Sequence, residues 1–188
     1  MKIAIFNGSP RKNGNTAAMT SSLKEKITAC SGKVNEHFLY HMAIKGCMNC
    51  GACQSGNGLK ECAIKDDAIP LLKEFLSSDL VIFASPVYMW HLTASLNAFI
   101  ERLHSLCNHG IPENRMAGKR IAIAMTMGDD EYVASDVVNS LLFFCEYFGL
   151  EYAGSFAVPF ASEEQILRPI YQEKMQDFVR KIMKKPEK

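Results

Sequence analysis

Short apolar runs alternate along this chain with longer stretches in which apolar residues recur at helical spacing. The run at 80–85 is continuously apolar, as in a strand buried on both faces of a sheet. The predicted strands cover 2–6, 33–39, 80–85, 120–127 and 151–158. Apolar residues three and four apart predict the helices. These cover about 15–30, a segment after Asp66-Asp67 with Ile69, Leu72, Phe75 and Leu76, a segment through Leu92, Leu96, Phe99, Ile100 and Leu103, 135–148 before Gly149, and 165–184.

This order of elements predicts one α/β domain over residues 1–188, with a doubly wound, five-stranded parallel sheet between two helical layers. Right-handed crossovers leave few topologies, and we expect the flavodoxin-like strand order 2-1-3-4-5. A Gly- and Cys-rich insertion at about 41–65 interrupts the alternation. Ligands of such sheets bind beyond the carboxyl ends of the strands, so the loops after strands one, three and four should line one crevice.

The first loop (8–16) is rich in groups that bind anions. It reads Gly-Ser-Pro-Arg-Lys-Asn-Gly-Asn-Thr and joins a strand to a helix N-terminus. Its glycines are expected to let the backbone approach a ligand, and its side chains suit a terminal phosphate monoester. The Walker A pattern is excluded because five residues separate Gly8 from Gly14 and Asn15 stands where a Lys is needed. The G-x-G-x-x-G fingerprint is absent as well, and the remaining alternative is a capped loop without a ligand.

The two other loops of the crevice add aromatic, sulfur and small residues. The loop after strand three (85–91) reads Ser-Pro-Val-Tyr-Met-Trp-His, and the loop after strand four reads Thr126-Met127-Gly128-Asp129-Asp130. Aromatic and sulfur side chains suit a flat ring system, and Gly128 permits close backbone approach. A phosphate pocket beside a ring pocket indicates flavin mononucleotide, FMN. The alternative for the aromatic residues is a packed surface or subunit interface.

Composition narrows the choice of partners and location. A net charge of +1 gives no electrostatic case for nucleic acid, and no apolar run reaches the length of a membrane span. With no apparent signal peptide, we expect a cytoplasmic protein, in which the seven cysteines would not form a disulfide framework.

The first loop, the Ser85-Pro86-Val87-Tyr88 segment and the segment 96–102 (Leu-Asn-Ala-Phe-Ile-Glu-Arg) resemble the NADPH-dependent FMN reductase family of flavodoxin-like oxidoreductases. The resemblance implies bound FMN, NAD(P)H as reductant, and a homodimer or dimer of dimers with flavin near the subunit boundary. It implies that the phosphate is held by Ser9, Arg11, Asn15 and Thr16. It further implies that the ring is flanked by Pro86, Val87, Tyr88 and Met89. The full candidate set adds Trp90, Thr126, Met127 and Gly128.

The insertion contains a compact C-x2-C-x2-C run, Cys47, Cys50 and Cys53, followed after eight residues by Cys62. Four thiolates can hold a [4Fe-4S] cluster, whereas zinc usually takes two separated C-x2-C pairs. The third interpretation, besides a cluster and zinc, is that free or oxidised thiols pack over the flavin without a metal. The run resembles the cluster loop of iron–sulfur flavoproteins, although the gap to Cys62, with Gly56 and Gly58, is longer than usual there.

The remaining polar residues suggest structural roles. The histidines at 37, 41, 91, 104 and 109 do not have the spacing of metal ligands. Only His91 lies in one of the loops that are expected to line the crevice. The Asp66-Asp67 and Asp129-Asp130 pairs are interpreted as helix caps. Helical positions predict core roles for Cys30, Cys107 and Cys145, and a solvated tail is expected at Lys181, Lys184, Lys185 and Lys188.

The leading hypothesis is an FMN-dependent oxidoreductase that passes electrons from NAD(P)H to a small-molecule or protein acceptor, with no catalytic acid or base. No basic site for a 2′-phosphate is identifiable, so NADH and NADPH both stay candidates. An alternative is an iron–sulfur electron carrier with a ferredoxin-like partner. A third is a redox-responsive binding protein whose thiols switch a partner surface.

Overall fold

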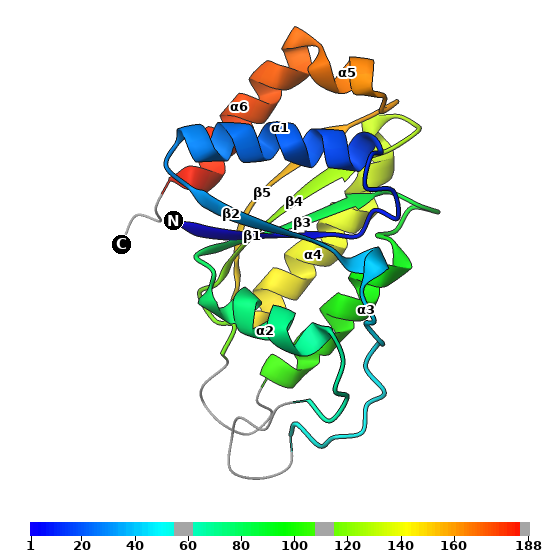
Figure 1. Ribbon diagram of the computed structural model, residues 1–188, viewed down its shortest axis with the longest axis vertical. Coiled ribbons are helices and arrows are strands. Elements are labelled where there is room, and N and C mark those ends of the chain that lie inside the picture. Colours follow the sequence, from blue (N-terminus) through cyan, green and yellow to red (C-terminus); the bar gives the residue numbers. More distant parts are fainter. Residues whose placement is uncertain (55–61, 108–114, 185–188) are drawn as a thin grey trace.

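The computed structural model describes residues 1–54, 62–107 and 115–184, and its centre is a five-stranded sheet (Figure 1). All neighbouring strands pair in parallel, in the order β2-β1-β3-β4-β5, which confirms the predicted topology. The strands are β1 (Lys2–Asn7), β2 (Lys33–Phe38), β3 (Leu80–Pro86), β4 (Arg120–Thr126) and β5 (Glu151–Val158).

Helices cover both faces of the sheet, as expected for a three-layer α/β fold (Figure 1). One face carries α1 (Asn15–Ala29), α5 (Glu163–Leu167) and α6 (Pro169–Met183), and the other α2 (Ala68–Ser77), α3 (Ala94–Arg102) and α4 (Ser135–Phe148). Alternation along β1 supplies both cores. Ile3 and Ile5 pack in the core beneath α1 and α6, whereas Ala4 and Phe6 pack in the core above α2 and α3.

Two predictions about individual segments were wrong. The closing helix is not continuous over 165–184, because Arg168 has extended backbone angles between α5 and α6. Pro169 follows it, and a proline disfavours the helical conformation of the preceding residue. Cys30 is exposed at the end of α1 and is not a core residue, whereas Cys107 and Cys145 are buried as predicted.

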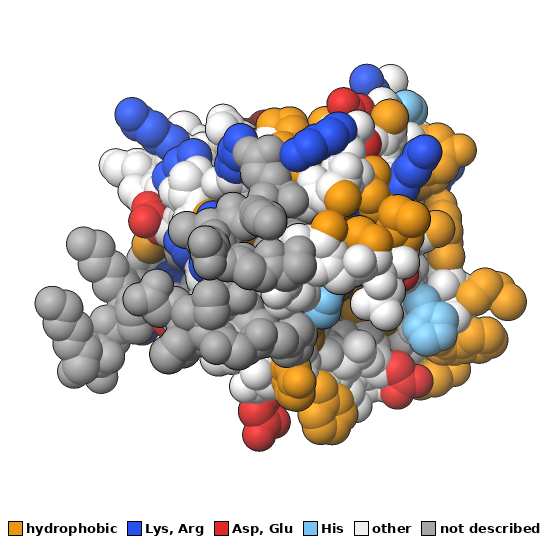
Figure 2. All heavy atoms as spheres, turned by 90° about the horizontal axis from the view of Figure 1, so that it is seen from below, with side chains coloured by type: hydrophobic (Ala, Val, Ile, Leu, Met, Phe, Trp, Pro, Cys, Tyr) orange, Lys and Arg blue, Asp and Glu red, His pale blue; other side chains and the backbone are white. Residues whose placement is uncertain are grey.

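The face formed by α2, α3 and α4 is shown in Figure 2. Hydrophobic side chains gather at its right-hand edge, toward the carboxyl ends of the strands. Among the described residues, no helix is both long and apolar enough to cross a membrane.

Candidate functional site

The N-terminus of α1 is open to an anion. Gly14 is its N-cap in an extended conformation, with no side chain capping the helix, so the first-turn N–H groups are available to a ligand. A pocket of about 180 Å³ lies in front of them. It is lined by Ser9, Arg11, Asn15, Thr16, Pro86, Val87, Tyr88, Thr126, Met127, Gly128 and Ala161.

Hydrogen bonds fix the pocket wall to the rest of the fold. The Thr16 and Thr126 hydroxyls lie 2.7 Å apart, which joins α1 to the end of β4. The Asn15 amide donates to the Ala161 carbonyl, so its nitrogen is engaged within the wall. The Arg11 side chain is exposed at the rim and carries the positive charge of the pocket lining.

A polar network under the first loop was not found from the sequence. Asn7 Oδ1 accepts a 2.8 Å hydrogen bond from the Ser9 N–H, and Asn7 Nδ2 donates to Glu36 Oε1 at 2.9 Å. Thr20 Oγ1 donates to the same carboxylate at 2.6 Å, and Lys24 Nζ donates to its other oxygen. Because three of these four hydrogen bonds converge on Glu36, this β2 residue fixes Asn7 and, through it, the course of the first loop.

Gly8 has a different role from the one expected. A Cβ at this position would lie 2.2 Å from Thr93 Oγ1 and 2.8 Å from Leu96 Cβ. The glycine is therefore needed for contact with the start of α3 rather than for approach of a ligand. Thr93 Oγ1 also donates to the Gly8 carbonyl at 2.9 Å.

The loop after β3 (85–91), the hairpin loop, makes a strained two-residue turn. Tyr88 and His91 exchange backbone hydrogen bonds of 2.9 and 3.0 Å, with Met89 and Trp90 between them. Both central residues have positive φ, +49° and +64°, which non-glycine residues rarely adopt. Met89 is 79% exposed and Trp90 55%, so the strain holds two large apolar side chains in solvent.

A second pocket of about 280 Å³ lies beside this turn. It is lined by Val87, Met89, Trp90, Met127, Gly128, Asp129 and Val133. Val87, Met127 and Gly128 belong to both pockets, so the two are joined. All twelve candidate cofactor residues therefore line one crevice at the carboxyl ends of β1, β3 and β4.

Gly128 faces open space in the crevice. A Cβ built there meets no atom within 4 Å, unlike the one at Gly8. The space beside Gly128 is therefore open crevice rather than protein.

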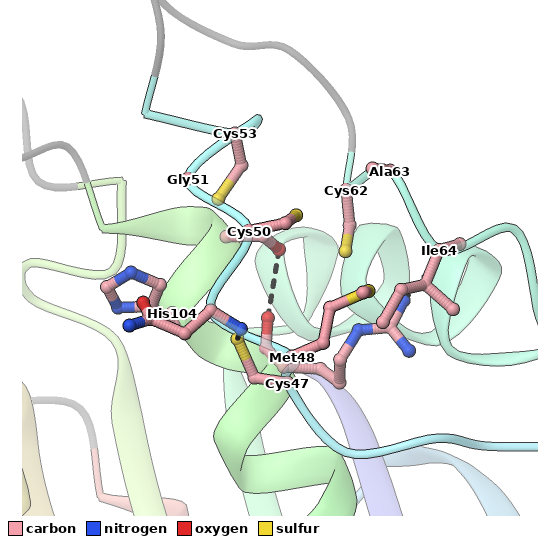
Figure 3. A pocket seen from close by; sticks show the side chains of 12 residues that line it. Cys47, Met48, Cys50, Gly51, Cys53, Cys62, Ala63, Ile64 and His104 are labelled. Carbon is pink, nitrogen blue, oxygen red and sulfur yellow. Dashed lines mark hydrogen bonds between the residues drawn. The ribbon is translucent and has the colours of Figure 1, made fainter.

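The four cysteines of the cysteine loop (47–62) surround a separate pocket against the end of α3 (Figure 3). Asn49 and Gly51 have positive φ, +50° and +69°, and curl the loop between its first three cysteines. Segment 55–61, with Gly56 and Gly58, lies outside the described residues. Cys107 lies near Cys53, and burial together with that neighbour raises the pKa of the Cys107 thiol to about 11.

The thiols do not form a ready site for a single metal ion. Within the described part of the chain, no three Cys, His, Asp or Glu side chains are placed to hold one. Zinc would draw four sulfurs to about 2.3 Å, so it is the less suitable occupant. A cuboidal iron–sulfur cluster spaces its thiolates more widely, but the pocket of about 10 Å³ has room for one water. The donor set fits a cluster, which would need a larger space than this pocket.

Other polar residues have structural partners. Asp130 Oδ1 accepts from the Glu131 N–H and caps a short 3-10 helix, as predicted. Asp66 accepts the N–H of Ala68 at the start of α2, and Asp67 instead accepts that of Ala43. His109, Lys185 and Lys188 lie outside the described residues.

Comparison with known protein families identifies the family of this chain. Residues 1–163 match the model of the NADPH-dependent FMN reductase family, which covers the first loop, the hairpin loop and the cysteine loop. The chain belongs to this family. The resemblance predicted from the sequence is therefore confirmed.

Relatives named iron–sulfur flavoproteins also match this chain. An iron–sulfur flavoprotein of Archaeoglobus fulgidus is 31% identical over 134 residues, which is 71% of this chain and 59% of that protein. One of Methanosarcina thermophila is 30% identical over 54% of this chain and 52% of its own. The match thus spans little more than half of these two relatives. One of Methanocaldococcus jannaschii is 28% identical over 76% and 72%.

Solved structures show the same fold. An NAD(P)H:quinone oxidoreductase from Methanothermobacter marburgensis superposes with a TM-score of 0.77 at 12% identity, over 100% of this chain and 99% of that one. An FMN-dependent NADH-azoreductase from Bacillus anthracis gives 0.67 at 12% identity, over 97% and 99%. At these identities, the likeness establishes the flavodoxin-like fold.

Proposed function

We propose that this protein binds FMN in the joined pockets and passes electrons from NAD(P)H to a small-molecule or protein acceptor. The observation that carries the proposal is one crevice in which an uncapped helix N-terminus adjoins an open apolar pocket. Bound FMN would supply the chemistry, accepting hydride and returning electrons singly or in pairs.

The chain's own residues bind and orient the cofactor in this proposal. The first-turn N–H groups of α1, the Ser9 and Thr16 hydroxyls and Arg11 hold the phosphate. Val87 and Met127 lie where the pockets join and contact the ring. No described residue is assigned a proton transfer.

The reductant and the acceptor would share the exposed face of the ring. The second pocket opens beside Met89 and Trp90, both of which are largely exposed. A nicotinamide or a flat small acceptor can stack against such side chains.

A flavin titration tests this proposal. Apoprotein should bind FMN more tightly than riboflavin, and NADH or NADPH should bleach the bound flavin anaerobically. Arg11→Met should weaken FMN binding and leave riboflavin binding unchanged, because riboflavin lacks the phosphate. Lys12→Met, which removes the neighbouring exposed cation, is the matched control. A wild-type protein without measurable affinity for FMN would overturn the proposal.

We include a homodimer or dimer of dimers in this proposal. On α4, Phe143 and Tyr147 are 72% and 75% exposed, one helical turn apart. Large exposed aromatics of this kind are typical of interfaces. Phe143→Glu should shift the mass measured by light scattering to that of a monomer, whereas Glu146→Gln on the same helix should not. A monomeric wild-type protein would contradict this part.

A second candidate function is an iron–sulfur electron carrier between a ferredoxin-like partner and the flavin. It is favoured by four cysteines from two limbs of one loop that surround the same pocket. Anaerobic reconstitution with iron and sulfide tests it by the metal content of the wild-type chain and of Cys62→Ser.

We also propose a cytoplasmic location for this protein, because seven cysteines suit a reducing compartment.

A further inference from the structure

Arg102, at the end of α3, connects the two limbs of the cysteine loop. Its Nη1 donates to the Lys45 carbonyl at 2.9 Å, and its Nη2 donates to the Ile64 carbonyl at 3.0 Å. Lys45 precedes Cys47 by two residues, and Ile64 follows Cys62 by two. One guanidinium therefore holds together the chain before the first cysteine and the chain after the last.

The adjacent residue on α3 completes this anchoring. Glu101 Oε2 accepts a 3.0 Å hydrogen bond from the Cys47 N–H. Gly46 makes this contact feasible, since a Cβ there would lie 2.5 Å from the same oxygen. The backbone at Cys47 is thus fixed by Glu101, and that on the Cys62 side by Arg102.

The Arg102 charge is buried. Its side chain is fully buried and pairs with Asp66 at 2.7 Å. Burial opposes the charge, but the hydrogen bond to Asp66, the Cys62 and Asp66 charges and a hydrogen bond to Cys62 outweigh it, so the pKa of Arg102 is raised. A fixed cation therefore forms part of the wall of the cysteine pocket.

One N–H of this cation has no partner. Among the described residues, Arg102 Nε is the buried side-chain nitrogen or oxygen left without a hydrogen bond. A buried donor left unpaired costs about 1–3 kcal/mol, so the position implies an acceptor that binds there. The sulfurs of Cys47 and Cys53, which line the same pocket, each already accept a hydrogen bond from an N–H group. Asn49 N donates to Cys47 Sγ at 3.4 Å, and Gln54 Nε2 donates to Cys53 Sγ at 3.5 Å.

We propose that Arg102 is a positioning residue for an anionic four-thiolate iron–sulfur cluster in the cysteine pocket, holding the loop base and donating Nε–H to the cluster or to the Cys62 thiolate. This inference rests on the second candidate function above. Glu101 and Arg102 would keep the base of the loop in place when a cluster is bound. Hydrogen bonds to cluster sulfurs favour the reduced form and raise the reduction potential.

Anaerobic reconstitution with ferrous iron and sulfide tests the role of Arg102. Wild type, Arg102→Lys and Arg102→Met are compared for iron and acid-labile sulfide per chain and for midpoint potential by electron paramagnetic resonance. We expect both variants to lose metal on gel filtration. Any cluster they retain should have a reduced form about tenfold less favoured, which is about 59 mV for one electron. Arg102→Lys keeps the buried cation without Nε, and it decides the result if the Met variant does not fold.

The control is Arg120→Met, which removes another buried arginine that pairs with Glu151 and donates to the Ile182 carbonyl of α6, on the other face of the sheet from α3. Its cluster should match that of wild type, and FMN binding reports folding in every variant. Wild-type metal content and potential in both Arg102 variants would overturn the inference while leaving the cluster in place. A wild-type chain that takes up no iron would overturn the cluster and the inference together.

Discussion

The side-chain amide of Asn7 donates a 2.9 Å hydrogen bond to Glu36 Oε1, which joins the last residue of β1 to the middle of β2 directly beneath the first loop. The other end of the same amide accepts the Ser9 N–H. The orientation of Asn7 is therefore set from one side by Glu36, and it sets the course of the loop on the other. A residue outside the pocket lining thus controls the geometry of the proposed phosphate site.

Replacing Asn7 by Leu should weaken FMN binding about tenfold, the effect of losing about 1.4 kcal/mol. The leucine has a similar shape but cannot orient the Ser9 N–H. Riboflavin affinity, measured by quenching of flavin fluorescence, should stay unchanged because only the phosphate site is disturbed. Lys24→Met removes the solvent-side partner of Glu36 and should leave both affinities within about twofold. Equal losses for FMN and riboflavin would show that the damage is not confined to the phosphate site.

The strand order was predictable because each strand is a short apolar run bounded by polar loops, and the helices between them keep helical spacing. Burial of single polar residues was not predictable in the same way. Glu36 lies on a strand with alternating exposure, and its burial results from α1 packing across it. The burial of Arg102 could have been predicted, because this residue falls between Phe99 and Leu103 on the apolar face of its helix.

Glycine roles also depend on contacts that the sequence does not contain. Gly8 and Gly128 each lie in a loop after a strand, and the sequence predicts the same role for both. One meets Thr93 and Leu96, and the other meets open space. Only the packing of α3 against the first loop separates the two cases.

Gly128→Leu should fold normally and lose at least about tenfold in FMN affinity, because its side chain fills the junction of the two pockets. Urea unfolding of the apoprotein should change by no more than about 0.5 kcal/mol. Gly8→Ala is the informative contrast. It should destabilise the apoprotein by about 1–3 kcal/mol, since its Cβ collides with the start of α3. A Gly128→Leu protein with full FMN affinity would contradict the placement of the ligand.

The strained turn of the hairpin loop predicts a gain in stability at the expense of flavin binding. Changing Met89-Trp90 to Asn-Gly supplies residues that accept positive φ, and it should stabilise the apoprotein by about 1–2 kcal/mol. The same change removes two apolar side chains from the ring pocket, so FMN and riboflavin should both bind more weakly. Urea midpoints and flavin titrations measure the two effects. Unchanged flavin affinity would show that Met89 and Trp90 do not contribute to binding of the flavin ring.

The ion pair between Asp66 and Arg102 should make stability depend on pH below about 4. Burial alone would raise the pKa of Asp66, but the bond from Arg102 and the N–H groups of Lys45 and Ala68 lower it below its ordinary value of 3.8. A carboxylate with a lowered folded pKa contributes stability above the ordinary value, and this is lost as pH falls through the folded value. Arg102 stays charged throughout.

Asp66→Asn should therefore lower the free energy of unfolding by about 3 kcal/mol at pH 7, because it leaves a buried cation without its counter-charge. The difference between wild type and variant should shrink as the pH falls below 3.8, where protonation removes the same charge from wild type. Urea unfolding at pH 7, 4 and 3 gives the comparison, with other carboxylates cancelling in the difference. Asp177→Asn, which breaks an exposed pair with Arg180, should give a near-zero difference at every pH. A constant gap between wild type and Asp66→Asn down to pH 3 would mean that the variant's loss comes from packing and not from charge.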